Sequence, residues 1–239
     1  MNPETTAVNP SGGAPTRQGS TEEALIEAFI RDLRTIPESR FEVYQKGWEG
    51  QLGMALVDAV YSKQTRYKTK RGKGLLPRLL AFQKKHEKAG EDLRELARLP
   101  EQELRLILGN GVTNGRTKAS AVLKAANSLI ALKVYTHQQY DHRQTSHRKA
   151  YLDVHGLGPV THNYLGMLLG YPDTKPDIWI IRAVRRVAAT AGLQIVVNAK
   201  IARLVLTEAH RDTGLGKTVT HMDHAVWLTE RKRSPHEAD

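Results

Sequence analysis

Apolar residues recur at helical spacing along most of the chain. Ser20 and Glu23 have the spacing of a capping box, and apolar residues at positions 25, 26, 29, 30 and 33 then predict a first helix. The same spacing predicts further helices over residues 50–63, 75–88, 101–108, 116–133, 147–154, 160–170, 178–190, 199–211 and 221–231. Gly, Pro and Asn interrupt these stretches, and one β-like run, 193–197, is interpreted as a connector. The predicted fold class is all-α.

Composition narrows the kinds of protein that the chain can be. Its 239 residues, of which 40% are hydrophobic and 26% charged, suit one large domain or two closely joined ones. Because the chain has no run of 18 apolar residues and no apolar segment near its start, we expect neither a membrane helix nor a secretory signal. The absence of cysteine excludes disulfides, thiol nucleophiles and cysteine metal sites, and it favours a cytoplasmic location.

The charge of the chain points to a polyanionic partner. Thirty-six Lys and Arg residues oppose twenty-five Asp and Glu residues, which gives a net charge of +11, and nucleic acid is the commonest partner of such a surplus. Residues 66–78 carry several basic side chains and no acidic one, so they form either a solvated face or a phosphate-contacting one. Residues 1–19, rich in Pro, Gly, Thr and Asn, are predicted to be a disordered tail.

Residues 154–158, with the sequence Val-His-Gly-Leu-Gly, have the form of a helix-hairpin-helix turn. Its glycines permit unusual backbone angles and the close approach of another molecule, and the N–H groups that open the next helix can hold a phosphate. A plain packing corner between two helices would explain the same residues. Further along, a Gly/Pro loop leads to Asp177 at the start of a helix, where an acid alone would be an ordinary N-cap.

Taken in this order, these residues resemble the helix-hairpin-helix (HhH-GPD) DNA glycosylases, the superfamily of endonuclease III. In that family the hairpin precedes a Gly/Pro-rich loop and a catalytic Asp that opens a helix, and the segment from Asp177 to Arg182 stands in that place. Residues 60–65 are similar to a family segment whose Gln enters the gap left by an extruded base, and residues 112–121 are similar to the segment before a long helix. The resemblance covers about residues 48–230.

The resemblance implies a two-lobed helical bundle with an active-site cleft between the lobes. Residues 20–235 would make up this fold. One central lobe would comprise about residues 50–155 and carry the hairpin at 154–161. The second would combine the N-terminal helical segment 20–47 with the C-terminal helices over 178–231.

The chain departs from the family pattern in two places. Bifunctional members carry a nucleophilic lysine two residues after the second hairpin glycine, and Val160 occupies that position here, so strand-cleaving lyase activity is not expected. The iron–sulfur cluster of some members cannot form without cysteine. We therefore expect no cofactor, and leave open a monovalent cation at the hairpin.

The implied function is that of a monofunctional DNA glycosylase, which flips a modified or damaged base out of duplex DNA and hydrolyses its N-glycosidic bond to leave an abasic site. Asp177 would be catalytic, because a carboxylate can stabilise the cationic sugar or activate the attacking water. The role would lie in base excision repair or in defence against phage DNA with hypermodified bases. A non-catalytic helix-hairpin-helix DNA-binding protein is the alternative.

The resemblance and the charge pattern also suggest binding residues. DNA contacts are expected from Gln64, Arg66, Lys68, Gly156, Gly158, Val160, Thr161 and Lys175. The base pocket would be lined by Trp48, Tyr61, Trp179, Asp223 and His224, with Trp227 beside them. No metal site is expected, and His137, His142 and His147, which share no helix face, are interpreted as part of a solvated loop. The protein would act on double-stranded DNA near the nucleoid as a monomer, with no membrane contact and no obligate protein partner.

Overall fold

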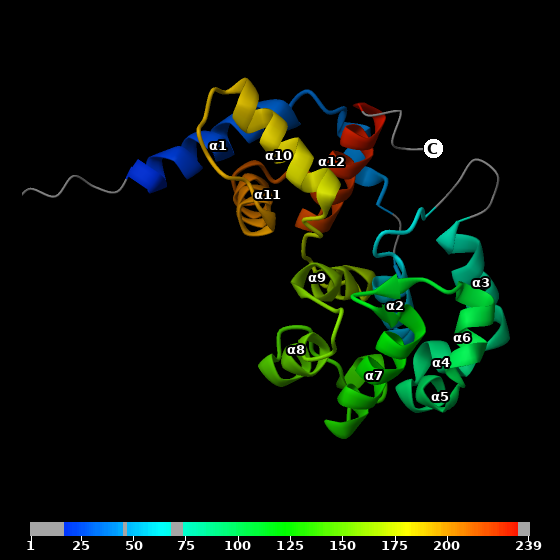
Figure 1. Ribbon diagram of the computed structural model, residues 1–239. Coiled ribbons are helices and arrows are strands. Elements are labelled where there is room, and N and C mark those ends of the chain that lie inside the picture. The colour runs from blue at the N-terminus through cyan, green and yellow to red at the C-terminus, as the bar shows by residue number, and fades with distance from the viewer. Residues whose placement is uncertain (1–16, 45–46, 68–73, 234–239) are drawn as a thin grey trace, which may run out of the picture.

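The computed structural model describes residues 17–44, 47–67 and 74–233 (Figure 1). The chain is mostly helical, which confirms the all-α class. In chain order, with η for a 3-10 helix, the elements are α1 (Arg17–Leu33), η1 (Glu38–Glu42), α2 (Leu52–Tyr61), α3 (Leu75–Lys85), α4 (Glu87–Glu91), α5 (Leu93–Arg98), α6 (Glu101–Leu108), β1 (Val112–Thr113), β2 (Arg116–Thr117), α7 (Lys118–Ala131), η2 (His137–Gln139), α8 (Thr145–Leu152), α9 (Pro159–Leu168), α10 (Ile178–Thr190), α11 (Ala199–Thr213) and α12 (Val219–Arg233).

The helices predicted from apolar spacing are present, with small shifts at their ends. The clearest correction is at the start, because α1 already begins at Arg17 and Ser20 lies inside the helix. Ser20 is therefore not the N-cap of a capping box, and the predicted tail cannot extend to residue 19. Residues 1–16, the rest of that tail, lie outside the described residues. The short helices α4 and α5 were not predicted, since neither is long enough to show an apolar period.

A small hairpin stands where the sequence was interpreted as a break between helices. Strands β1 and β2 pair antiparallel around the Asn114-Gly115 turn. Both turn residues have positive φ, +46° and +76°, which is the geometry that two-residue hairpins favour and that Asn-Gly adopts readily. Asn114-Gly115 therefore indicates a β-hairpin, which the helical spacing of the flanking residues did not predict.

Two separate hydrophobic cores underlie the two halves of the molecule. Residues between 52 and 169 form the first core, with α2 buried along its whole length. Residues 25–41 and 180–226 form the second, from α1, α10, α11 and α12 (Figure 1). Close helix packing in the first core depends on Gly53, because a Cβ there would lie 2.0 Å from the carbonyl oxygen of Ala89 on α4.

The chain passes between the two cores twice, and the two crossings touch. The Trp48 N–H donates to the Leu168 carbonyl over 2.6 Å, and the Tyr44 hydroxyl donates to the Met167 carbonyl over 3.2 Å. Gly47 permits this approach, since a Cβ would lie 2.5 Å from the Leu168 carbonyl oxygen. The segment before α2 therefore packs against the end of α9, where the connector to α10 begins. Among the helices of the described ranges, none is long and apolar enough to cross a membrane.

Candidate active site

A lysine lies at the junction of the two cores. The Lys175 ammonium sits 3.6 Å from the centre of the Tyr164 ring on α9 and 3.3 Å from the Ser62 hydroxyl, which follows α2. The Lys175 backbone N–H donates to the Asp223 carboxylate on α12 over 3.0 Å. Burial lowers the pKa of Lys175, and the charges of neighbouring acids oppose that shift. The side chain thus points inward, although the sequence had suggested a contact with DNA.

Asp177 lies two residues further along and caps α10. Its carboxylate accepts hydrogen bonds from the N–H groups of Trp179 and Ile180 at 2.9 and 3.4 Å. Its own N–H donates to the Lys175 carbonyl over 2.6 Å, which makes a tight turn around Pro176. Burial raises the pKa of Asp177, while Lys175 and the two backbone donors oppose the rise. Asp177 is therefore the N-cap of α10, and its carboxylate is close enough to Lys175 for the lysine charge to affect its pKa.

Two further acids complete the group around Lys175. Asp58 on α2 is fully buried, and its Oδ2 accepts from the Trp48 indole at 2.8 Å and from the Tyr67 hydroxyl at 2.9 Å. Burial raises the pKa of Asp58 to about 6, against the effect of these hydrogen bonds. Burial also raises the pKa of Asp223 well above its ordinary value, and the charge of Asp177 adds to the rise. All three acids near Lys175 therefore have raised pKa values, with burial as the largest cause.

Aromatic side chains stack along the α12 face next to these acids. The His224 and Trp227 rings are nearly parallel at 5.7 Å, and the Arg231 guanidinium lies 4.5 Å from the centre of the Trp227 ring. Tyr44 meets His224 edge-on at 5.5 Å. The positive charge of Arg231 also lowers the pKa of Asp177, so the stack reaches the neighbourhood of that carboxylate. Planar bases stack on rings of this kind.

The hairpin turn and the Gln64 segment are joined by hydrogen bonds. The Gly156 carbonyl accepts from Thr113 of β1 at 2.8 Å and from the Lys63 ammonium at 3.3 Å. Gln64, next to Lys63, is exposed and has a φ of +52°, a left-handed conformation that is unusual for a residue other than Gly. Such strain persists only where the surroundings hold it, and it occurs often at functional sites.

Lys118 holds the Gln64 segment in this shape. Its buried ammonium donates to the Tyr61 carbonyl at 3.1 Å, to the Thr65 hydroxyl at 2.8 Å and to the Lys63 carbonyl. Burial and the nearby charge of Lys63 lower the pKa of Lys118 to about 8. These bonds satisfy the carbonyls that α2 leaves open at its end. Lys118 belongs to the 112–121 segment that resembles the family, but the sequence did not predict this role for it.

The remaining predicted residues lie in different surroundings. Gly158 is extended and opens α9, and Thr161 caps that helix through bonds to Gly158 while itself being buried. Tyr61 is 2% exposed in the first core, with its charged neighbours Glu101 and Arg105 on α6, so it belongs to the core. The Trp48 indole donates to Asp58, and the backbone N–H of Trp179 donates to Asp177. Val160 is half-buried and Arg66 is exposed. Lys68 lies outside the described residues.

The interpretation of the 136–147 histidines as solvated is wrong for two of them. His142 and His147 are 8% and 5% exposed. The His142 ring stacks on His162 of α9 at 4.2 Å, and His147 stacks at 5.7 Å on Tyr140 of its own segment. A shared helix face is therefore not needed to bury them. Among the residues described here, no three His, Cys, Asp or Glu side chains are grouped to hold a metal ion.

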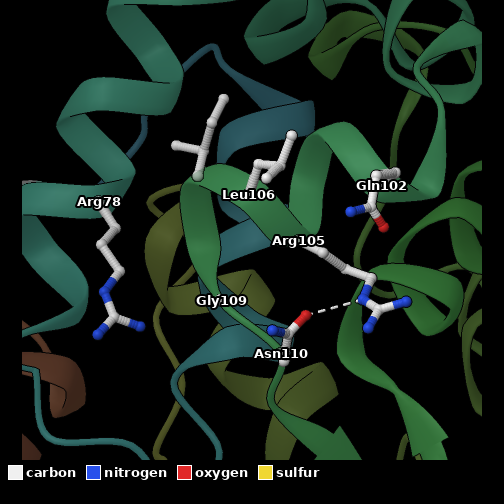
Figure 2. Close-up of a pocket in the computed structure, with 7 residues that line it drawn as sticks. Arg78, Gln102, Arg105, Leu106, Gly109 and Asn110 are labelled. Carbon is white, nitrogen blue, oxygen red and sulfur yellow. Dashed lines mark hydrogen bonds between the residues drawn. The ribbon is translucent and has the colours of Figure 1, made fainter.

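Two cavities lie apart from the Lys175 group. One of about 470 Å³ is lined by Arg78 on α3 and by residues at the end of α6, including Arg105 and Asn110, which are hydrogen-bonded to each other (Figure 2). The other, of about 790 Å³, lies between α1 and α11. Neither is lined by Lys175 or Asp177, so the predicted cleft between the lobes stays a prediction.

Comparison with known proteins gives the family of the chain. The chain belongs to the family described as Domain of unknown function (DUF8548), which matches residues 24–231 and so spans both hydrophobic cores. No curated protein and no solved structure matched the chain.

Replacing Asp58 with Asn is expected to change how stability depends on pH. Because the folded pKa of Asp58 is about 6 and its ordinary value is 3.8, its contribution to stability is full at low pH and is lost as pH rises through 6. Relative to Asp58→Asn, the wild type should lose about 2 kcal/mol between pH 4 and 7. Urea unfolding at both pH values measures this loss. Asp153→Asn, an exposed change, should follow the wild type, and a difference between Asp58→Asn and wild type that is the same at both pH values would contradict the assignment.

Proposed function

We propose that this protein is a monofunctional DNA glycosylase. It flips a modified or damaged base out of duplex DNA and hydrolyses the N-glycosidic bond, leaving an intact strand with an abasic site. The site is built around Asp177 and Lys175, at the junction of the two cores.

One observation carries this proposal. Three motifs resemble the glycosylase family, and the Gln64 segment is bonded to both of the others although the bonded residues are 93 and 113 positions apart in the sequence. Lys63, beside Gln64, donates to the Gly156 carbonyl of the hairpin, and Ser62 of the same segment contacts the Lys175 ammonium, two residues before Asp177. A packing corner alone gives no reason for the Gln64 segment and the Asp177 loop to meet at one place. Binding and chemistry on one flipped nucleotide require that meeting.

The chemistry follows from a carboxylate next to the scissile sugar. As the bond between C1′ and the base nitrogen breaks, its electron pair leaves with the base and the sugar becomes cationic. Ionised Asp177 stabilises that cation, and it accepts a proton when water adds to C1′. The proton then passes to the departed base through solvent, which restores the carboxylate. The charge of Lys175 opposes the rise in the pKa of Asp177 that burial causes, and it therefore favours the ionised carboxylate.

The exposed, strained Gln64 suits the space that the extruded base leaves in the duplex. Arg66, two residues on, is exposed as well and suits a phosphate on the same face. The half-buried rings of Tyr44, His224 and Trp227 suit an aromatic contact with the flipped base. The net charge of +11 supplies the salt-dependent part of DNA affinity.

The substrate can be found by a panel of DNAs. Genomic DNA, alkylated, oxidised and deaminated DNA, and phage DNA with natural modified bases are each incubated with the protein, and released bases are identified by mass spectrometry. Release from damaged DNA favours a role in repair, whereas release from phage DNA alone favours defence. If no DNA in the panel releases a base above background, the proposed function is wrong.

Asp177→Asn is expected to abolish base release, by at least about a thousand-fold, and to leave DNA affinity within two-fold. Asn is a good N-cap, so α10 should keep its start and the loss would be chemical. Single-turnover base release and DNA binding are measured side by side. The matched control is Asp92→Asn, which makes the same exchange at the N-cap of α5 and should leave release unchanged. Near wild-type release by Asp177→Asn would show that the catalytic assignment is wrong and that Asp177 is only a helix cap.

Gly158→Val is expected to weaken DNA binding by about ten-fold or more, at a cost in stability of about 1 kcal/mol because Val is a poorer N-cap than Gly. Gly158 has extended backbone angles, and a Cβ there would meet no protein atom within 4 Å. The added side chain would therefore obstruct a phosphate that approaches the start of α9. Gly156 is unsuitable for this test, since its φ is +93° and a Cβ would lie 2.9 Å from Thr113. Titration with duplex DNA and thermal unfolding check the result. Unchanged affinity in folded Gly158→Val would identify the turn as a packing corner.

The reaction product is expected to be an unbroken strand, because Val160 replaces the amine that would attack C1′. Product DNA is run on a denaturing gel with and without hot alkali, and borohydride trapping is done in parallel. Strand breaks should appear only after alkali, with no covalent adduct. A trapped adduct that disappears in Lys175→Ala would overturn this expectation and make Lys175 the nucleophile.

A further inference from the structure

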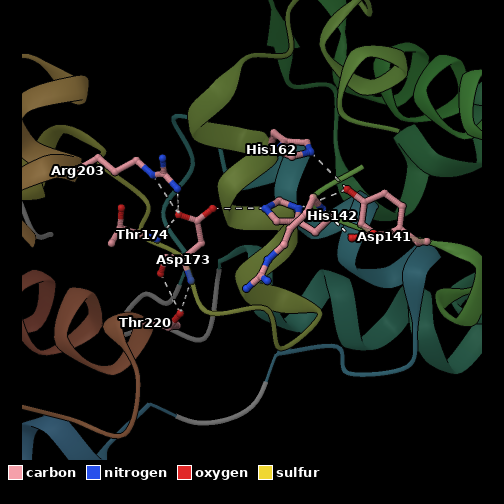
Figure 3. Close-up of polar contacts among 9 residues, drawn as sticks. Asp141, His142, His162, Asp173, Thr174, Arg203 and Thr220 are labelled. Carbon is pink, nitrogen blue, oxygen red and sulfur yellow. Dashed lines mark hydrogen bonds and ion pairs between the residues drawn. The ribbon is translucent and has the colours of Figure 1, made fainter. Parts of the chain in front are cut away.

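The connector between α9 and α10 carries a second buried acid, Asp173, four residues before Asp177. Its side chain bonds to both halves of the molecule (Figure 3). The Arg203 guanidinium of α11 donates to Oδ1 from two nitrogens, at 3.0 and 3.2 Å. His142, in the first half, lies 3.4 Å from Oδ2. One carboxylate therefore joins side chains whose own helices and loops pack on different cores.

The backbone of the same residue is tied to α12. The Asp173 N–H donates to the Thr220 hydroxyl over 3.1 Å, and that hydroxyl donates back to the Asp173 carbonyl over 2.8 Å. Two residues on, the Lys175 N–H bonds to Asp223 of α12. Thr220 and Asp223 are three apart and lie on one helix face. The connector is thus held along α12 at alternate residues up to the Asp177 turn.

The contact on the side of the first core is equally well defined. The His142 ring stacks on His162 at 4.2 Å, and the Tyr140 hydroxyl lies within 3.5 Å of both rings. Gly166 of α9 makes the room, since a Cβ there would lie 2.5 Å from His142 Nε2. Burial and the neighbouring His142 lower the pKa of His162 to about 3, so that ring is neutral at physiological pH. His142 therefore meets Asp173 from a fixed position.

Asp173 is suited to hold these groups because it stays charged. It is 7% exposed, and burial alone would raise its pKa. The hydrogen bonds from His142 and Thr174 and the charge of Arg203 outweigh burial and lower the pKa instead. Removing this carboxylate leaves the buried His142 ring without its partner on one side and releases the exposed Arg203 guanidinium on the other.

We infer that Asp173 is a positioning residue. Its contacts with His142 and Arg203, called the clasp below, set the orientation of the two halves and the placement of Lys175 and Asp177 between them. This inference rests on the proposed glycosylase function in so far as it concerns catalysis. Misplacement of a reacting group by about 1 Å can cost about a hundred-fold in rate. The clasp should therefore act on the rate of the chemical step more than on DNA affinity.

The kinetic test uses a duplex carrying the base that the panel identifies. Arg203→Met removes the ion pair with Asp173 by changing a side chain that is exposed. Arg211→Met is the control, because Arg211 lies on the same helix and is also ion-paired. Arg203→Met should lower kcat at least ten-fold with KM within two-fold, whereas both variants should unfold within about 2 °C of each other. Arg203→Lys, which keeps the charge, should recover part of the rate. Equal kcat values for Arg203→Met and Arg211→Met would overturn the inference.

A second measurement does not depend on activity. Because the chain has no cysteine, L106C and V196C, at residues 71% and 83% exposed and on different halves, can carry a pair of spin labels. Pulsed electron resonance should give a narrow distance distribution in the wild-type and Arg211→Met backgrounds. It should give one at least twice as wide with Asp173→Ala or Arg203→Met. An unchanged width in both clasp variants would overturn the inference. If the wild type releases no base, the proposed function is wrong, but the distance measurement still tests whether the clasp sets the orientation of the two halves.

Discussion

A charge balance at the junction of the two cores is the constraint on which the site depends. One ammonium, that of Lys175, faces carboxyl groups from α2, from the connector and from α12. Burial raises the pKa of all three acids, and the charge of Lys175 opposes the rise in each of them. Each comes from a different element, and the charge state of the site therefore depends on how the two halves of the chain pack against each other.

The parts of this site that the sequence predicted are those with a local cause. The hairpin glycines, the N-cap at Asp177 and the helix spans follow from rules that act over a few residues. The two-stranded hairpin at Asn114 was missed, although its cause is local too, because the flanking helical pattern dominated. The match to the DUF8548 family over residues 24–231 covers these local features and the connector alike, but it names no chemistry.

What the sequence did not predict depends on packing between distant elements. Asp58 is an acid within the apolar stretch of α2, and such a residue should have been expected to find buried partners. Which partners it finds, Trp48 and Tyr67, depends on the crossing of the chain between the cores. The error over His142 has the same origin, because a test for a shared helix face ignores rings that arrive from α9. Tyr61 is buried in the first core, whereas Tyr67, six residues later, donates to Asp58. Residues of the same type and close in the sequence therefore have different roles.

Alternate residues of the connector take on the tasks that join fold and site. Asp173 binds both halves, Lys175 supplies a positive charge next to the three acids, and Asp177 starts α10 and supplies the carboxylate of the proposed site. Because the residues between them, Thr174 and Pro176, are buried, the odd-numbered residues cannot exchange places with their neighbours without losing the packing. A change of one residue in connector length would therefore separate the lobe contact from the chemistry. For this reason the connector, more than the hairpin, determines whether the two halves form one site.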